Sequence, residues 1–175
     1  MEKNIFTLLL ASATMFSAAS ASAQDFRPSG YMGFVDFGDG FDVEDFDTYN
    51  VTVTTIHGYQ FNPHLFLGLG AEAQFITNGS DDYTCLPVFL DLRYNILKSR
   101  VTPFIELRGG YDLGETEEQY EAAQIGVDVA LTERFGLYAG LNFRTQFGYD
   151  FDDYRWDEQD PDRISYVGVT FGLHF

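Results

Sequence analysis

Cysteine and positive charge are both scarce in this sequence. A single cysteine, Cys85, occurs among 175 residues, which excludes a disulfide within the chain and a metal centre built from several thiolates of one chain. The 10 Lys and Arg residues stand against 27 Asp and Glu, giving a formal net charge of -17. Nucleic-acid binding requires a basic face, so no nucleic-acid partner is expected.

Long apolar runs are missing after the first 23 residues, where no stretch of about 18 apolar residues offers a membrane-spanning helix. This leaves membrane β-barrels open, because each barrel strand needs only about 9–11 residues. Hydrophobic residues still make up 45% of the chain, which is too many for a disordered protein. The length fits one domain.

The amino-terminal segment has the three parts of a secretory signal peptide. Lys3 supplies the positive charge, residues 5–16 form the apolar stretch, and Ala21-Ser22-Ala23 is a small-residue cleavage site. We therefore expect a signal peptide at 1–23 and a mature domain at 24–175. The signal directs the chain out of the cytoplasm.

Within the last twelve residues, 164–175, apolar side chains alternate with small or polar ones from Val167 onward. A period of two is typical of a strand with one apolar face. The pattern recurs upstream, and no long segment repeats apolar residues at intervals of three and four as an amphipathic helix would. The expected strands are 30–37, 49–61, 65–75, 86–96, 101–113, 122–131, 135–147 and 164–175.

The connections between these strands alternate strictly in length. Short ones follow the second, fourth and sixth strands, and longer polar ones follow the first, third, fifth and seventh; the long connections are 38–48, 76–85, 114–121 and 148–163. Outer-membrane barrels have short periplasmic turns and long external loops. The fold class predicted is therefore all-β, an eight-stranded antiparallel up-and-down transmembrane β-barrel.

The polarity of the strand faces separates a membrane barrel from a soluble one. A lipocalin-like barrel also has eight strands but faces its apolar residues inward. Here that arrangement would leave Leu65, Leu67 and Leu69 in water and place charges in the core. The charged residues of the opposite, inward face are Asp36, Glu72, Asp91, Arg93, Glu106, Arg108, Asp128 and Arg144.

Three segments carry a family resemblance: GYQFNPHLFLGLG at 58–70, PVFLDLRYNI at 87–96, and the terminal TFGLHF. With the signal peptide, they resemble the small eight-stranded OmpA/OmpX-type barrels and the porin-like outer-membrane β-barrel domain family. The resemblance covers the whole mature chain and implies residence in the outer membrane of a Gram-negative-type bacterium, among membrane lipid and lipopolysaccharide. It also implies that Phe171, Leu173 and Phe175 form an assembly signal for the barrel-assembly machinery.

The inward charges are expected to form ion pairs. Partners across one antiparallel turn have a constant index sum, and we centre the short turn between Ser99 and Arg100. The resulting pairs are Arg93 with Glu106 and Asp91 with Arg108, with Glu72 expected nearby. Because eight strands enclose a space just wide enough for side chains, we expect a plug; an ion or proton path is the alternative.

The five inward acids outnumber the three inward arginines, so some carboxylates need other partners. The candidates are water, Tyr138, Asn142, Gln74 or a bound proton.

Enzyme chemistry finds little support in the sequence. His57, His64 and His174 all fall near the short turns, and no Asp/His/Ser grouping occurs in the long connections. Lipid A modification, which uses residues near the outer leaflet, is therefore not expected. We interpret the histidines as interfacial polar tips and Cys85 as a small buried residue, and predict no catalytic, cofactor or metal site.

The long connections hold most of the acid, and three interpretations stay open. They form a solvated, self-repelling fringe, bind divalent cations alone or between lipopolysaccharide phosphates, or recognise an extracellular partner. An EF-hand is not supported, because 150–162 lacks its glycine and spacing. Exposed aromatics among acids favour recognition; the candidates are Asp152, Tyr154, Trp156 and Asp157.

The sequence thus predicts a small outer-membrane barrel with a plugged polar interior and a structural or surface-interacting, non-catalytic role. The first alternative is a narrow pore or gated transport barrel, and the second is a lipid A-modifying enzyme.

Overall fold

The computed structural model describes residues 27–43, 48–78, 81–113, 119–148 and 162–175. The signal peptide predicted at 1–23 lies outside these residues. So do the loop residues Asp152, Tyr154, Trp156 and Asp157, and the other acids of 149–161.

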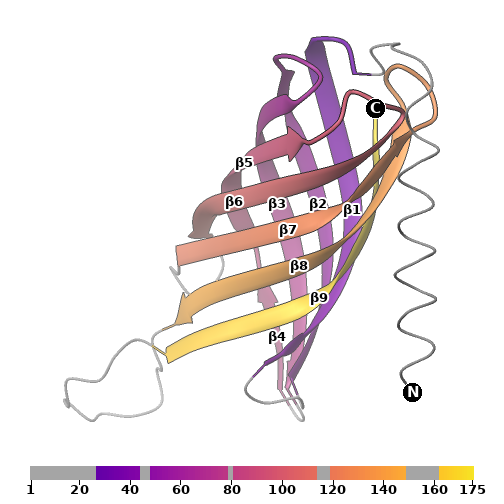
Figure 1. Ribbon diagram of the computed structural model, residues 1–175. Helices are drawn as coiled ribbons and strands as arrows, with labels where there is room; N and C mark the ends of the chain where they lie inside the picture. Colours follow the sequence, from indigo (N-terminus) through magenta and orange to yellow (C-terminus); the bar gives the residue numbers. More distant parts are fainter. Residues whose placement is uncertain (1–26, 44–47, 79–80, 114–118, 149–161) are drawn as a thin grey trace, which may run out of the picture.

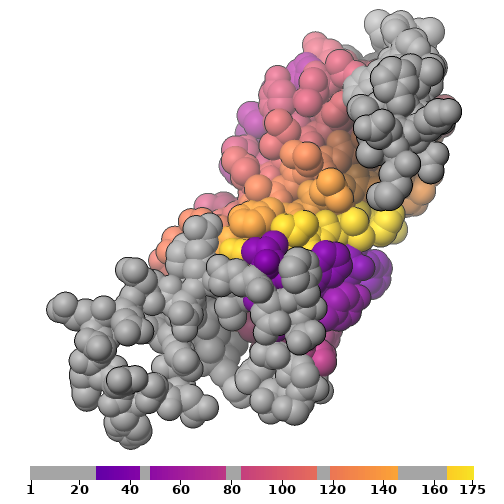
Figure 2. Space-filling view, turned by 60° about the horizontal axis from the view of Figure 1, so that its bottom comes forward, coloured from indigo at the N-terminus to yellow at the C-terminus, as the bar shows by residue number. Residues whose placement is uncertain are grey.

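The described residues form strands that close into one antiparallel barrel (Figure 1). The strands are β1 Gly30–Asp42, β2 Thr48–Gln60, β3 Leu65–Asn78, β4 Asp81–Cys85, β5 Pro87–Asn95, β6 Val101–Asp112, β7 Gln119–Ala130, β8 Gly136–Gly148 and β9 Asp162–His174. Strands that follow one another in the chain pair with each other, except β4 and β5, which both pair with β3; β1 also pairs with β9, which closes the sheet. Figure 2 shows β9, in yellow, running beside β1, in indigo. No helix among the described residues is long and apolar enough to cross a membrane.

The short strands β4 and β5 form one barrel strand with a break at Leu86. Both pair with β3, β4 at its end and β5 nearer its start. At the break, the backbone N–H of Leu86 donates a hydrogen bond to Asp112 Oδ1 at 2.7 Å. The predicted count of eight barrel strands is therefore confirmed.

All four predicted long connections belong partly to strands, since β7 already begins at Gln119, β8 runs to Gly148 and β9 begins at Asp162. β1 continues to Asp42, and β3 and β4 extend as a hairpin in which Asn78 pairs with Asp81. Gly38 is the first residue of the predicted connection 38–48, but it belongs to β1 and faces inward, where a Cβ would lie 2.6 Å from Thr52 Oγ1 and 2.9 Å from Arg144 Nη2. The glycine therefore makes room inside a strand and does not mark its end.

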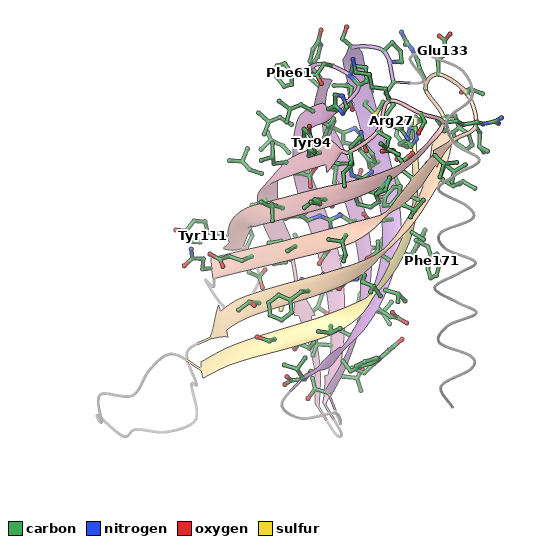
Figure 3. The ribbon with its side chains drawn as sticks, viewed as in Figure 1. Arg27, Phe61, Tyr94, Tyr111, Glu133 and Phe171 are labelled. Carbon is green, nitrogen blue, oxygen red and sulfur yellow. The ribbon has the colours of Figure 1, made fainter. Side chains whose placement is uncertain are left out.

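The barrel has an apolar outer face and a polar inner one, as predicted. Leu69 and Phe171 are 66% and 62% exposed, whereas every predicted inward charge is at most 6% exposed. Figure 3 shows Tyr111 and Phe171 on the outside of the wall. Because the alternation decides which face each side chain occupies, the sequence was sufficient to place these residues.

A buried hydrophobic cluster, mostly of aromatic residues, lies inside the barrel and was not predicted. The same alternation places these residues on the inward face, but the prediction named mainly the charged residues of that face. Its members are Met32, Phe34, Ile56, Phe66, Phe89, Phe104, Tyr120 and Tyr138. The interior thus combines ion pairs with close aromatic packing, both of which fill the narrow lumen.

Candidate functional site

The charged interior is the candidate functional site, and its register is the predicted one. Arg93 lies opposite Glu106, and Asp91 opposite Arg108. Arg93 Nε donates to Glu106 Oε2 at 2.5 Å, and Arg108 Nε donates to Glu106 Oε1 at 2.8 Å. Arg108 Nε also lies 3.6 Å from Asp91 Oδ1. The four side chains form one crossed ion-pair cluster on β5 and β6.

Arg108 connects this cluster to the far wall of the barrel. Its Nη2 donates to Asp36 Oδ2 on β1 at 2.9 Å, and its Nη1 donates to Glu72 Oε2 on β3 at 3.2 Å. The expectation that Glu72 lies near the cluster is therefore confirmed. Because β6 and β1 are not neighbours in the sheet, the Arg108–Asp36 pair crosses the lumen.

Glu72 is the carboxylate around which the middle of the network is arranged. It accepts hydrogen bonds from Thr54 Oγ1 and Gln74 Nε2, each at 2.8 Å. Arg144 Nε lies 3.4 Å from Glu72 Oε1, and Arg144 Nη2 donates to Thr52 Oγ1 at 3.0 Å. These contacts add β2 and β8 to the walls that the network joins.

Two of the candidate partners for the surplus carboxylates make the expected contact. Tyr138 donates its hydroxyl to Asp36 Oδ2 at 2.8 Å, and Gln74 donates to Glu72. Asn142 does not: its Nδ2 donates to Thr170 Oγ1 at 2.6 Å. Asn142 is therefore not the partner of a surplus carboxylate; its donor is used by Thr170 on the adjacent strand β9.

Asp128 receives two partners that sequence reasoning missed, Arg27 and His174. Arg27 Nη2 donates to Asp128 Oδ1, and His174 Nε2 lies 3.3 Å from the same oxygen. Arg93 Nη1 lies 3.7 Å from the other oxygen. Cationic or hydrogen-bonding side chains therefore converge on one acid at the short-turn end.

The interpretation of His174 as an interfacial tip was wrong, since this side chain is fully buried. Its place in the alternation indicated an inward side chain, because it lies between the outward-facing residues Leu173 and Phe175 on the terminal strand. Arg27 precedes β1, where no strand alternation indicates direction.

Three aromatic rings surround the guanidinium of Arg93. Its Cζ lies 4.0 Å from the ring centroid of Phe104, 4.2 Å from that of Tyr138 and 4.4 Å from that of Phe34. Desolvated cation–π contacts of this kind are worth about 2 kcal/mol. The cage fixes a large cation in the lumen beside the ion pairs.

The two other histidines lie near the short turns, as predicted. His57 faces outward, where its Nδ1 is 2.6 Å from the Tyr31 hydroxyl and its Nε2 is 3.0 Å from Thr55 Oγ1. His64 Nδ1 lies 2.7 Å from the carbonyl oxygen of Asn95. Both nitrogens of His57 are thus occupied by hydroxyl groups on the outer wall.

Metal chemistry receives no geometric support from the part of the chain that the structure describes. Within it, no three His, Cys, Asp or Glu side chains are grouped as ligands for a metal ion. Cys85 lies at the end of β4 and is half-buried, whereas the sequence predicted a buried residue.

Comparisons with known proteins give likenesses at the level of fold. No protein-family model and no curated protein sequence matches the chain. The structure of Neisserial surface protein A has a TM-score of 0.56 at 13% identity, covering 85% of this chain and 98% of that one. The outer membrane enzyme PagL has a TM-score of 0.55 at 13% identity, covering 79% and 97%.

A de novo designed transmembrane β-barrel is also similar, with a TM-score of 0.51 at 16% identity, covering 87% of this chain and 98% of the design. A surface protein, an enzyme and a design thus share one architecture, and fold alone does not assign a task. The chain has the fold of the small eight-stranded outer-membrane barrels, as the sequence resemblance implied.

Proposed function

We propose that this protein is an outer-membrane barrel with a plugged interior and a structural or surface-interacting, non-catalytic role. The observation that carries the proposal is the Arg108 contact network, which joins β6 to β1 and β3 through the lumen. A side-chain bridge between opposite walls occupies the space that a solute would need.

Opening such a plug is energetically costly. Removing one partner of a buried ion pair leaves the other charge uncompensated, at a cost of about 3–5 kcal/mol. Arg108 contacts several acids at once, and Arg93 is held by Glu106 and by three rings. The alternative of a narrow or gated pore would require these contacts to break together.

The placement in the outer membrane is part of the same proposal. The exposed apolar side chains, such as Leu69 and Leu141, match the lipid-facing band of a membrane barrel. The predicted signal peptide at 1–23 would direct export, and Phe171, Leu173 and Phe175 would serve the assembly machinery. The short turns would then face the periplasm, and the long connections the outside and its lipopolysaccharide.

The acidic long connections are the proposed surface for interaction. Asp152, Tyr154, Trp156 and Asp157 combine acids with aromatic side chains, which favours recognition of an extracellular partner. Divalent cations are the other proposed partner for these acids. The barrel would serve as the rigid scaffold that displays them.

Single-channel recording in planar bilayers tests the plug. The purified protein is first shown to fold by its boiled and unboiled gel mobilities and to fractionate with the outer membrane. We expect no steady open steps; such steps would replace the plugged barrel with the pore alternative. Lipid A from cells with and without the protein is expected to have the same mass, and a difference would indicate enzyme activity.

A further inference from the structure

Arg27 lies before the first strand, but its side chain reaches into the barrel. It precedes β1, yet its side chain is only 2% exposed, and Figure 3 places it at the same end of the barrel as Phe61 and Glu133. Gly30, the first residue of β1, has a φ of 144°, a value that side-chain-bearing residues rarely adopt. This glycine lets the chain turn from β1 across the short-turn mouth.

The groups around the guanidinium of Arg27 come from three other parts of the barrel. Nη1 donates to the carbonyl oxygen of Ser99 in the β5–β6 turn at 3.1 Å, and Nη2 donates to Asp128 on β7. His174, from the end of β9, lies 3.3 Å from the same carboxylate. A carbonyl oxygen and a carboxylate side by side match the planar donor fork of a guanidinium.

We infer that the barrel wall forms a guanidinium-binding site at its short-turn end, and that Arg27 fills this site as an internal ligand. Residues 27–30 then act as a strap that closes the mouth. The receiving groups belong to the wall, because Asp128 on β7 also contacts His174 on β9 and Arg93 on β5. Its ligand class is an alkylguanidinium cation, supplied here by the chain's own arginine side chain.

The burial of the receiving groups supports a ligand site over a surface ion pair. Asp128 and His174 are 1% and 0% exposed, and His174 Nε2 faces the Asp128 carboxylate at 3.3 Å. A surface pair would contribute little, whereas a desolvated carboxylate without its cation is costly. Removing Arg27 should therefore leave a vacancy that selects a guanidinium of the same shape.

Chemical rescue of Arg27→Ala tests the inference. The temperature at which the barrel unfolds, read from the gel-mobility shift, is measured with increasing millimolar ethylguanidinium. We expect Arg27→Ala to lower this midpoint, and ethylguanidinium to raise it again saturably, as a ligand of the folded state must. Ethylurea, an uncharged relative of similar shape, should have no such effect.

Two variants serve as controls. Arg134→Ala removes an exposed arginine at the same end and should show neither the loss nor the rescue. Arg27→Ala combined with Asp128→Asn removes the receptor carboxylate and should abolish the rescue. If Arg27→Ala does not refold alone, the refolding yield with and without ethylguanidinium becomes the readout. Absence of rescue, or equal rescue in the Asp128→Asn double variant, would overturn the inference.

Discussion

The ring of Phe175 packs edge-on against the imidazole of His57, with their centroids 6.4 Å apart and their planes at 74°. His57 belongs to β2, and Phe175 directly follows β9, so the contact spans β1 between them. Gly33 of β1 lies underneath: its backbone exchanges two hydrogen bonds with Phe175, at 2.8 and 2.9 Å. A terminal aromatic residue thus joins three strands where the barrel closes.

Gly33→Ala should weaken this closure. A Cβ at Gly33 would lie 2.8 Å from Phe175 Cζ, so the ring must move away from His57. Because that ring is 43% exposed and can shift, we expect a loss below the about 1–3 kcal/mol of overpacking in a closed core, read as a lower midpoint of thermal unfolding on detergent gels. The matched control is Gly109→Ala on β6, where an added Cβ meets nothing within 4 Å. An equal decrease of the midpoint in both variants would contradict the packing of Phe175 over Gly33.

Deletion of Phe175 should have two separable effects. The purified barrel should unfold at a lower temperature because the contact with His57 is lost. In cells, less folded barrel should reach the outer membrane, since the residue also belongs to the proposed assembly signal. The measurement is the boiled and unboiled mobility of the membrane fraction. Phe171→Ala, which removes a 62% exposed ring, should affect delivery more than the stability of the refolded protein; the reverse order would argue against this assignment.

The strands and the central ion pairs could be predicted from the sequence. Both follow from the alternation of side chains along each strand and from the position of the short turns. Alternation places Asp91, Arg93, Glu106 and Arg108 inside, and the short turn then sets their pairing. The same logic would have placed His174 inside. It was misassigned because proximity to the turn was weighted above its position in the alternation.

Contacts that depend on side-chain direction or on segments outside strands could not be predicted. Arg27 lies before β1, and nothing in its neighbourhood fixes a face. The lateral reach of Arg108 to Asp36 depends on barrel closure and on rotamers, which strand pairing does not specify. Asn142 shows the limit clearly: its inward position was predictable, but its choice of Thr170 over a carboxylate was not.

Glu106→Leu should destabilise the barrel strongly, because it leaves Arg93 and Arg108 without their shared carboxylate. Breaking a buried pair costs about 3–5 kcal/mol, whereas replacing both partners by apolar residues of similar volume is often nearly neutral. The double variant Arg93→Met with Glu106→Leu should therefore recover part of the loss. Urea unfolding of the refolded protein gives both free energies. A double variant less stable than Glu106→Leu would mean that the aromatic cage around Arg93 outweighs the ion pair.

Arg108→Ala should turn the plugged barrel into a leaky, cation-selective one. The substitution removes the side chain that crosses the lumen to Asp36 and leaves that acid, Glu72 and Asp91 with less positive charge around them. A wider, net acidic lumen favours cations. We expect conductance steps in planar bilayers whose reversal potential in a salt gradient indicates cation selectivity. Arg100→Ala, at a turn where Nε donates to the Ala130 carbonyl at 2.9 Å, should stay silent. A folded but silent Arg108→Ala barrel would show that the remaining side chains suffice to close the lumen, and that Arg108 is not the residue on which the plug depends.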